Sequence, residues 1–156
     1  MIWSRVDFKI APEKIVDVHI KKNLLGSIAA GSLRSANAHA ANMLLAFYLA
    51  TGQDAANIVE GSQCIVHCEM QNDALYFSVT IPNIIVGTVG NGKGLDFVQE
   101  NLALMKLTEN AEPGKNSRKL AIIAAATVLC GELSLLGAIA NPGELMQSHI
   151  AIERGK

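Results

Sequence analysis

The segment from Leu33 to Ala50 constrains the fold most, because it consists largely of small and aliphatic residues interrupted by polar side chains at helical spacing. A helix of this composition is expected to be buried on most sides. Ser35, His39 and Asn42 stand at positions i, i+4 and i+7, so a continuous helix would align them in one stripe. Buried polar groups need hydrogen-bond partners, so the stripe either meets another polar element within the core or lines a cavity that accepts a polar ligand.

The carboxylate of Asp54 follows this segment closely. Gly52 is expected to be the C-terminal cap of the helix, which puts Asp54 near the negative end of the helix dipole. A carboxylate is disfavoured there unless a cation or a donor offsets it, and Lys22 is a candidate cation. The alternative is that Asp54 caps the start of a turn over residues 55–60, since aspartate is a favoured N-cap. The sequence leaves both alternatives open.

The composition predicts one folded unit, residues 1–156, with a large protein interface. The formal net charge of -1 gives no electrostatic reason to expect binding to nucleic acid or to an anionic membrane. The hydrophobic fraction is 50% and the charged fraction 17%, against roughly 25% charged residues in ordinary domains. This surplus of apolar surface favours an association between protein chains.

The cysteines and the apolar segments favour a cytoplasmic protein without a metal site. Cys64 and Cys68 share a predicted strand face about 13 Å apart, beyond the roughly 7 Å that a disulfide allows. No C-x-x-C motif accompanies the scattered histidines, so zinc has little support. No apolar signal segment follows Met1. Leu120–Ala140 is rich in alanine and carries Glu132 at mid-depth, so we predict a buried helix and no membrane segment.

The pattern along the chain predicts an α+β fold with a long central buried helix, an antiparallel hairpin plus a further strand, and C-terminal helices. The first twenty residues alternate, with Val16, Val18 and Ile20 on one side, and predict a strand. A hairpin with its turn at residues 71–73 is expected next, with His67 and Glu69 on its solvated face. Its apolar face should comprise Cys64, Val66, Cys68, Met70, Leu75, Phe77, Val79 and Ile81.

Residues 87–94 form a glycine-rich loop between a predicted short strand, Ile84–Val86, and a predicted helix over residues 95–106. Backbone N–H groups in this context can receive a phosphate. The spacing matches neither G-x-G-x-x-G nor a Walker loop, so a tight structural turn is an equal alternative. Further helices are predicted over residues 117–140 and 144–153, and Glu132 in the first of these should have a hydrogen-bonding or ionic partner.

Several motifs taken in order resemble one enzyme family. The motifs are KKNLLGS (residues 21–27), NAHAAN (37–42), GQD (52–54), GTVG (87–90), GELSL (131–135) and SH (148–149). Together they resemble the C-terminal half of the catalytic domain of class I 3-hydroxy-3-methylglutaryl-CoA (HMG-CoA) reductase, and GQD with GTVG favours class I over class II. The resemblance spans nearly the whole chain and implies part of the large domain of that fold.

The resemblance implies reduction of HMG-CoA to mevalonate and free CoA, a step towards isoprenoid precursors, by two hydride transfers from NADPH or NADH. Asp54 would belong to a charge network with a lysine and a glutamate that stabilises and protonates the developing oxyanion. His149 would protonate the departing CoA thiolate. Family members build active sites across subunit interfaces, so a homodimer or higher homo-oligomer is expected.

The resemblance also implies binding residues. Lys22, Ser32, His39 and Asn42 would hold the acyl part, with Lys22 pairing with its carboxylate. An apolar wall beside the substrate would comprise Leu135, Ala138 and Ile139. The cofactor would contact Gly87, Thr88, Val89 and Gly90, with Arg154 as a looser match. No metal is implied.

The chain departs from the family pattern in three respects. Asn91 stands where the family's glycine motif usually continues with glycine, and residues 141–143 are one residue longer than the usual connection. The family's first cofactor motif, its catalytic glutamate and its network lysine lie upstream of the region that this chain covers. We therefore predict that the chain alone does not turn over substrate. The alternative function is a non-catalytic assembly or CoA-ligand-binding module that keeps the fold.

Overall fold

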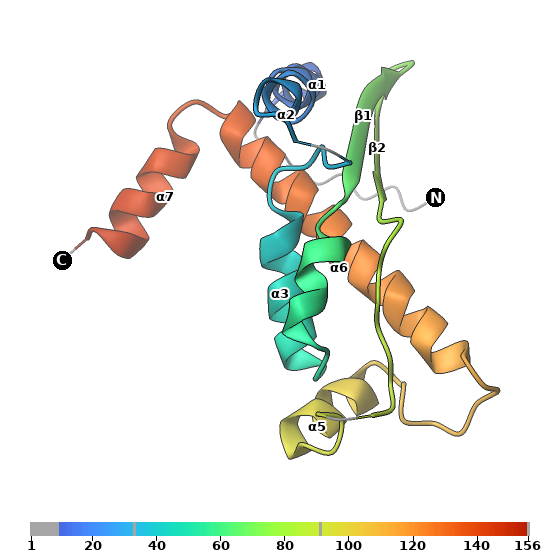
Figure 1. Ribbon diagram of the computed structural model, residues 1–156. Coiled ribbons are helices and arrows are strands. Elements are labelled where there is room, and N and C mark those ends of the chain that lie inside the picture. Colours follow the sequence, from blue (N-terminus) through green and yellow to red (C-terminus); the bar gives the residue numbers. More distant parts are fainter. Residues whose placement is uncertain (1–9, 33, 91, 156) are drawn as a thin grey trace.

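The computed structural model describes residues 10–32, 34–90 and 92–155, and its central element is the long helix α6 (Lys115–Ala140). Helix α3 (Ala40–Ala50) and the hairpin pack against α6, while α1 lies near its C-terminal part (Figure 1). The α+β class with a long central helix, an antiparallel hairpin and C-terminal helices is therefore confirmed.

Helix α6 contributes every fourth residue to the core. Three apolar clusters lie along it, one after another. Its buried residues at this spacing are Leu120, Ala124, Val128, Glu132, Leu136 and Ala140. Each fully buried leucine or valine contributes roughly 1.5–3 kcal/mol, so this stripe is the main apolar surface that joins the other elements.

Residues 12–29 are helical, so the predicted strand through Val16, Val18 and Ile20 is wrong, while its first nine residues lie outside the described part of the chain. Helix α1 (Pro12–Val18) continues into the π-helical η1 (His19–Gly26) and α2 (Ser27–Ala29). Pro12 suits a first helical turn, where its missing N–H has no helical acceptor to lose. The buried residues Ile15, His19 and Asn23 recur every fourth position, and this helical periodicity outweighs a three-residue alternation.

Helix α3 begins at Ala40, later than the predicted Leu33, which lies outside the described residues. The preceding segment is extended and pairs with the hairpin through a parallel bridge between Ala36 and Ile65. Ser35 therefore precedes the helix, and the predicted stripe with His39 and Asn42 does not form. Burial is also confined to one face of α3, because Leu45 and Leu49 are 41% and 58% exposed.

The hairpin has the predicted faces. Strands β1 (Ile65–Gln71) and β2 (Ala74–Thr80) are antiparallel, and Val66 pairs with Val79 and Cys68 with Phe77 on the apolar face. His67 and Glu69 lie on the solvated face, with side chains 55% and 45% exposed. The expected further strand at Ile84–Val86 pairs with no strand in the described part of the chain, so the sheet there has two strands.

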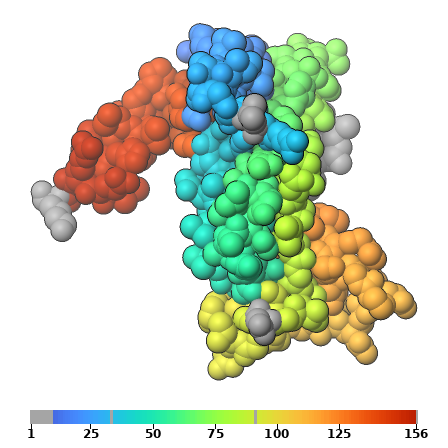
Figure 2. All heavy atoms as spheres, in the orientation of Figure 1, coloured from blue at the N-terminus to red at the C-terminus, as the bar shows by residue number. Residues whose placement is uncertain are grey.

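The connections and the C-terminal helices complete the chain. After α3 come the short helices η2 (Ala55–Asn57) and α4 (Ile58–Gly61), and after the hairpin comes α5 (Asp96–Leu104). Helix α7 (Glu144–Glu153) follows a break at Asn141–Gly143, as predicted. It contains no buried residue and projects from the body of the molecule, as Figures 1 and 2 show.

The expected partner of Glu132 is found. Its carboxylate accepts hydrogen bonds from the main-chain N–H groups of Ala38 and His39, both at 2.7 Å. By length and composition α6 could also cross a membrane, a test that core helices pass too. Its contacts with α3, with α1 and with β2 place one face of it in the core, and 28% of its most apolar stretch is buried.

Candidate active site

The turn that carries Asp54 begins at the C-terminal end of α3. Gly52 has φ of 62°, the left-handed conformation that a helix C-terminus favours and glycine adopts readily. The Asp54 carboxylate accepts a hydrogen bond of 2.9 Å from the N–H of Ala56 and so caps η2. The N-cap alternative is therefore confirmed, and the remaining carboxylate surface is exposed to solvent.

Three side chains donate to the last carbonyl groups of α3 and its turn. Asn101 Nδ2 lies 2.8 Å from the carbonyl oxygen of Ala50, and Gln53 Nε2 lies 2.7 Å from that of Thr51. The ammonium group of Lys93 donates to the carbonyl oxygen of Gly52. These donors satisfy carbonyl groups that have no partner within the helix.

The cation beside this helix end is Lys93, and the expectation of Lys22 in that place is wrong. Lys93 is 8% exposed, and burial lowers its pKa below the ordinary value. Lys22 lies exposed on η1, and no ion pair joins it to Asp54 among the described residues. A cation at the negative end of the helix dipole is the arrangement that electrostatics favours.

The side chain of Gln53 joins the Asp54 turn to the glycine-rich loop. Its Nε2 donates to the carbonyl oxygen of Gly87 at 3.0 Å, and its Oε1 accepts from the N–H of Gly87 at 2.8 Å. The two backbones also approach closely at Gly52 and Gly92, where a Cβ on Gly52 would lie 2.6 Å from the carbonyl oxygen of Gly92. The structure thus brings Asp54 and the GTVG motif together.

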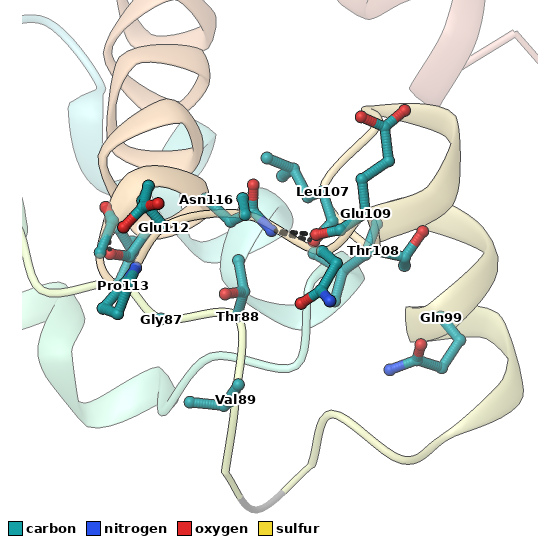
Figure 3. A pocket seen from close by; sticks show the side chains of 16 residues that line it. Gly87, Thr88, Val89, Gln99, Leu107, Thr108, Glu109, Glu112, Pro113 and Asn116 are labelled. Atoms are coloured by element: carbon teal, nitrogen blue, oxygen red, sulfur yellow. Dashed lines mark hydrogen bonds between the residues drawn. The ribbon is translucent and has the colours of Figure 1, made fainter.

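The GTVG segment lines a cavity of about 780 Å³ to which neither Gln53 nor Asp54 contributes. Its opposite wall is the loop over residues 107–114 together with the first turn of α6, where Asn116 holds the loop by donating to the carbonyl oxygens of Leu107 and Glu109, both at 3.0 Å. Figure 3 shows the Thr88 side chain rising from the GTVG wall towards Asn116 on the other side of the cavity.

The glycine-rich loop fits a phosphate-bearing cofactor. In the described part of the chain, the N–H groups of Thr88, Val89 and Gly90 have no intramolecular acceptor. Gly90 and Gly92 have φ of 112° and 81°, and nothing lies within 4 Å of a Cβ built on Gly90. Free N–H groups on an open glycine backbone can receive the oxygens of an anionic ligand.

His39 lies at the start of α3 and contacts α6. Its Nε2 lies 2.8 Å from the carbonyl oxygen of Gly131, and its own N–H donates to Glu132. Asn42, three residues later, is exposed on the first turn of α3. The predicted apolar wall, Leu135, Ala138 and Ile139, continues the same side of α6 beyond Gly131 and is half-buried.

The two remaining acyl-site candidates come from the N-terminal helices. Lys22 is exposed on η1, and Ser32 is exposed just after α2. Ser32 lines a smaller cavity of about 220 Å³. The other described residues around this cavity are Asn23, Leu24, Ser27, Ile28, Arg34, Ser35, Ala36 and Ile65.

The α7 candidates lie apart from the Asp54 turn within one chain. His149 Nδ1 forms an ion-pair contact of 2.9 Å with Glu153 one turn later, and the His149 side chain is 46% exposed. Arg154 follows at the end of the same helix and is exposed. In Figure 1 α7 projects away from the body at the C-terminal end of α6, whereas the C-terminal end of α3 lies near α5.

Two polar residues with structural roles in the site were given no role from the sequence. In the sequence, Lys93 is identified only as a member of the glycine-rich loop, and Gln53 only as the middle residue of the GQD motif. The signal that could have identified Lys93 is a lone lysine among glycines, following a motif whose turn needs a cation.

Comparison with known proteins assigns the family. The family model described as hydroxymethylglutaryl-coenzyme A reductase matches residues 5–154. The chain belongs to this reductase family. The 3-hydroxy-3-methylglutaryl-coenzyme A reductase 1 of Oryza sativa subsp. japonica is 47% identical over 150 residues, which are 94% of this chain and 28% of the relative. The corresponding reductase of Aeropyrum pernix is 49% identical over 148 residues, 94% of this chain and 35% of the relative.

The chain spans about a quarter to a third of these reductases. Reductase 1 of Arabidopsis thaliana, for example, is 47% identical over 150 residues that make up 25% of its length. The resemblance inferred from the GQD, GTVG and GELSL motifs is therefore confirmed at the level of the family.

Proposed function

We propose that this chain is the part of an HMG-CoA reductase that supplies the catalytic aspartate, one wall of the cofactor site and the acyl-binding residues. The reaction is the reduction of HMG-CoA to mevalonate and CoA with NADPH or NADH, in the cytoplasm. The observation that supports this most strongly is the pair of hydrogen bonds between Gln53 and Gly87, because it holds the Asp54 turn against the GTVG loop.

In this proposal Asp54 handles a proton at the substrate carbonyl. The nicotinamide cofactor, when bound, supplies the hydride. Asp54 lies at the end of α3 with carboxylate surface exposed to solvent, where it can deliver a proton to the oxygen on which negative charge develops. The N–H groups at residues 88–90, which have no acceptor among the described residues, would hold cofactor phosphate oxygens, and the Thr88 side chain would contact the cofactor from the cavity.

The remaining roles follow the family resemblance. Lys22 pairs with the acyl carboxylate, while Ser32, His39 and Asn42 contact the acyl part along the wall formed by α6. His149 protonates the CoA thiolate. Because α7 stands away from α3 within one chain, we propose that a homodimer or higher homo-oligomer completes the site, with α7 of one copy near α3 of another.

The second candidate function is a non-catalytic module that binds a CoA ligand. The separation of His149 from the Asp54 turn within one chain favours it. Both candidates predict that the chain binds ligand. They differ in whether its residues contribute to turnover in a longer reductase.

Titration calorimetry and an activity assay test these proposals. The chain should bind NADPH or NADH, and Gly90→Ala should weaken binding at least several-fold, because its φ of 112° disfavours a side chain. Gly94→Ala, with no positive φ and no neighbour within 4 Å, is the matched control. Likewise HMG-CoA binding should fall in Lys22→Met and not in Lys14→Met, which is also exposed.

Neither candidate predicts NAD(P)H oxidation with HMG-CoA by this chain alone, so the assay separates them in the longer reductase that contains this segment. In the longer reductase, Asp54→Asn should lower kcat by about 10²–10⁴-fold, whereas Asp73→Asn in the hairpin turn should not. Wild-type activity in Asp54→Asn would reject the catalytic assignment, and an absence of any nucleotide binding would reject the cofactor site.

A further inference from the structure

The acidic residue Glu132 lies in the centre of the apolar stripe of α6. It is 0% exposed, and its neighbours one turn away along the stripe, Val128 and Leu136, are equally buried. A carboxylate in such a place is costly unless hydrogen bonds satisfy it. An apolar residue would continue the stripe at lower cost, so the position of the acid calls for a role beyond packing.

Both oxygens of this carboxylate are used at the entrance to α3. Oε2 accepts from the N–H of Ala38 and Oε1 from the N–H of His39, each at 2.7 Å. These lengths are typical of charge-assisted hydrogen bonds. His39 has φ of -160° and ψ of 34°, which is not helical, and the two bonds fix its backbone in that conformation.

The residue before Glu132 holds the imidazole ring of His39. Its Nε2 lies 2.8 Å from the carbonyl oxygen of Gly131. A carbonyl oxygen can only accept, so Nε2 must carry the hydrogen. In the neutral imidazole the other ring nitrogen, Nδ1, is then an acceptor.

Gly131 permits this approach of α6 to α3. A Cβ at this position would lie 3.4 Å from His39 Nε2 and would overlap with the side chain of Met43. The pair Gly131–Glu132 therefore holds the backbone and the ring of one residue through two consecutive positions of α6.

We propose that Glu132 is a positioning residue for His39. By fixing the His39 backbone, it keeps the ring bonded to the Gly131 carbonyl through Nε2 and leaves Nδ1 to accept a hydrogen bond from a ligand hydroxyl group. The hydrogen bond from a ligand hydroxyl group to Nδ1 rests on the proposed function, in which His39 contacts the hydroxyl-bearing acyl part. The positioning of the ring by Glu132 in the free chain does not depend on the proposed function.

Nuclear magnetic resonance of the full chain with ¹⁵N-labelled histidine tests the tautomer and the hydrogen bond of the His39 ring. We expect a slowly exchanging Nε2–H signal for His39, assigned by its loss in His39→Gln. Glu132→Gln, which places an amide donor against one of the two main-chain N–H groups, should speed the exchange of this proton about tenfold or more.

Val128→Ala is the matched control, because it removes packing one turn away on the same stripe without touching the carboxylate. A merely structural role of Glu132 predicts similar exchange in both variants at equal global stability, and that result would overturn the proposal. So would an Nδ1–H tautomer, or the absence of a protected Nε2–H signal, in the wild-type chain. If Glu132→Gln does not fold, Glu132→Asp, which shortens the side chain that makes both bonds, takes its place, and the wild-type spectrum still decides the tautomer of the ring.

Addition of ligand tests the predicted hydrogen bond between the ligand hydroxyl group and His39 Nδ1. HMG-CoA should shift the Nδ1 resonance of His39, and the analogue without the 3-hydroxyl group, 3-methylglutaryl-CoA, should shift it much less. Equal shifts would overturn the hydroxyl assignment. If neither compound perturbs any resonance, the proposed function and the predicted hydrogen bond to the ligand both fail, while the exchange data still decide whether Glu132 positions the ring.

Discussion

The ammonium group of Lys93 donates a hydrogen bond to the carbonyl oxygen of Gly52, two residues before Asp54. A buried cation thereby lies at the negative end of α3, in the loop that would receive cofactor phosphates. Two effects oppose each other here, because desolvation of the ammonium group is unfavourable and its interaction with the helix carbonyl is favourable. Burial lowers the pKa of Lys93 below its ordinary value, which is the direction that desolvation of an ammonium group produces.

The first prediction follows from this balance. Lys93→Met should leave the free energy of unfolding at pH 7 within about 1 kcal/mol of wild type or raise it, while weakening NAD(P)H binding. Because the folded pKa is lowered, the unfolded state binds more protons between that pKa and 10.5, and wild-type stability gains from this group as the pH rises. Any gain in the free energy of unfolding of Lys93→Met over wild type should therefore shrink towards pH 10.5 in urea titrations. A gain that grows with pH would contradict the lowered pKa of Lys93.

The second prediction concerns Gln53. Gln53→Met keeps the length of the side chain and leaves the carbonyl groups of Thr51 and Gly87 and the N–H of Gly87 without these partners. At about 1 kcal/mol for each lost bond, the free energy of unfolding should fall by about 2–3 kcal/mol. Amide exchange should also accelerate near Gly87. Gln71→Met, in an exposed strand end, should change neither measurement.

Sequence patterns predicted the elements whose residues interact locally. The hairpin faces, α6 and the break before α7 all follow from periodicity and from proline and glycine within a few positions. The N-terminal strand failed because Val16, Val18 and Ile20 alternate for too short a stretch to exclude a helix.

Long-range hydrogen bonds account for the other errors. The start of α3 is set by Glu132, which is 94 positions from Ala38 in sequence, and by Asn37, which donates to the carbonyl oxygen of Cys64. Lys93 and Gly52 are 41 positions apart. No local pattern encodes which of several lysines reaches a given carbonyl group, so the sequence points to Lys22 where the structure has Lys93.

The third prediction is a loss of stability in mild acid caused by His19. This histidine is 1% exposed, and burial first, then the charge of His67, lowers its pKa below 6.5. Between the folded pKa and 6.5 the unfolded state binds more protons, so stability falls as the pH falls, by about 1.4 kcal/mol per pH unit. His19→Gln should flatten this part of the urea-unfolding profile between pH 7 and 5. An unchanged slope would show that another group is responsible.

The fourth prediction distinguishes the three cysteines. Burial raises the pKa of Cys68 to about 11, and burial together with the Glu132 carboxylate raises that of Cys64 to about 12. Both stay protonated and covered at pH 8, whereas Cys130 is exposed. Mass spectrometry after brief iodoacetamide treatment should find one adduct on the native chain, none on native Cys130→Ser, and three on the wild-type chain in urea. Adducts at Cys64 in the native chain would contradict its burial.

The close approach of Gly52 and Gly92 gives the last prediction. Gly52→Ala would place a Cβ 2.6 Å from the carbonyl oxygen of Gly92 and 3.1 Å from Val98, at a residue with φ of 62°. The left-handed backbone alone costs an alanine about 1–2 kcal/mol, and displacing a backbone carbonyl adds about 1–3 kcal/mol.

Urea unfolding of Gly52→Ala should therefore show a loss of at least about 2 kcal/mol, and nucleotide affinity should fall as the glycine-rich loop moves away from the Asp54 turn. Gly94→Ala in the same loop, with open space around it, separates this effect from a general loss of loop flexibility. If Gly52→Ala destabilised the chain and nucleotide affinity stayed at the wild-type value, the two loops would be joined for stability alone, and cofactor binding would not depend on their contact.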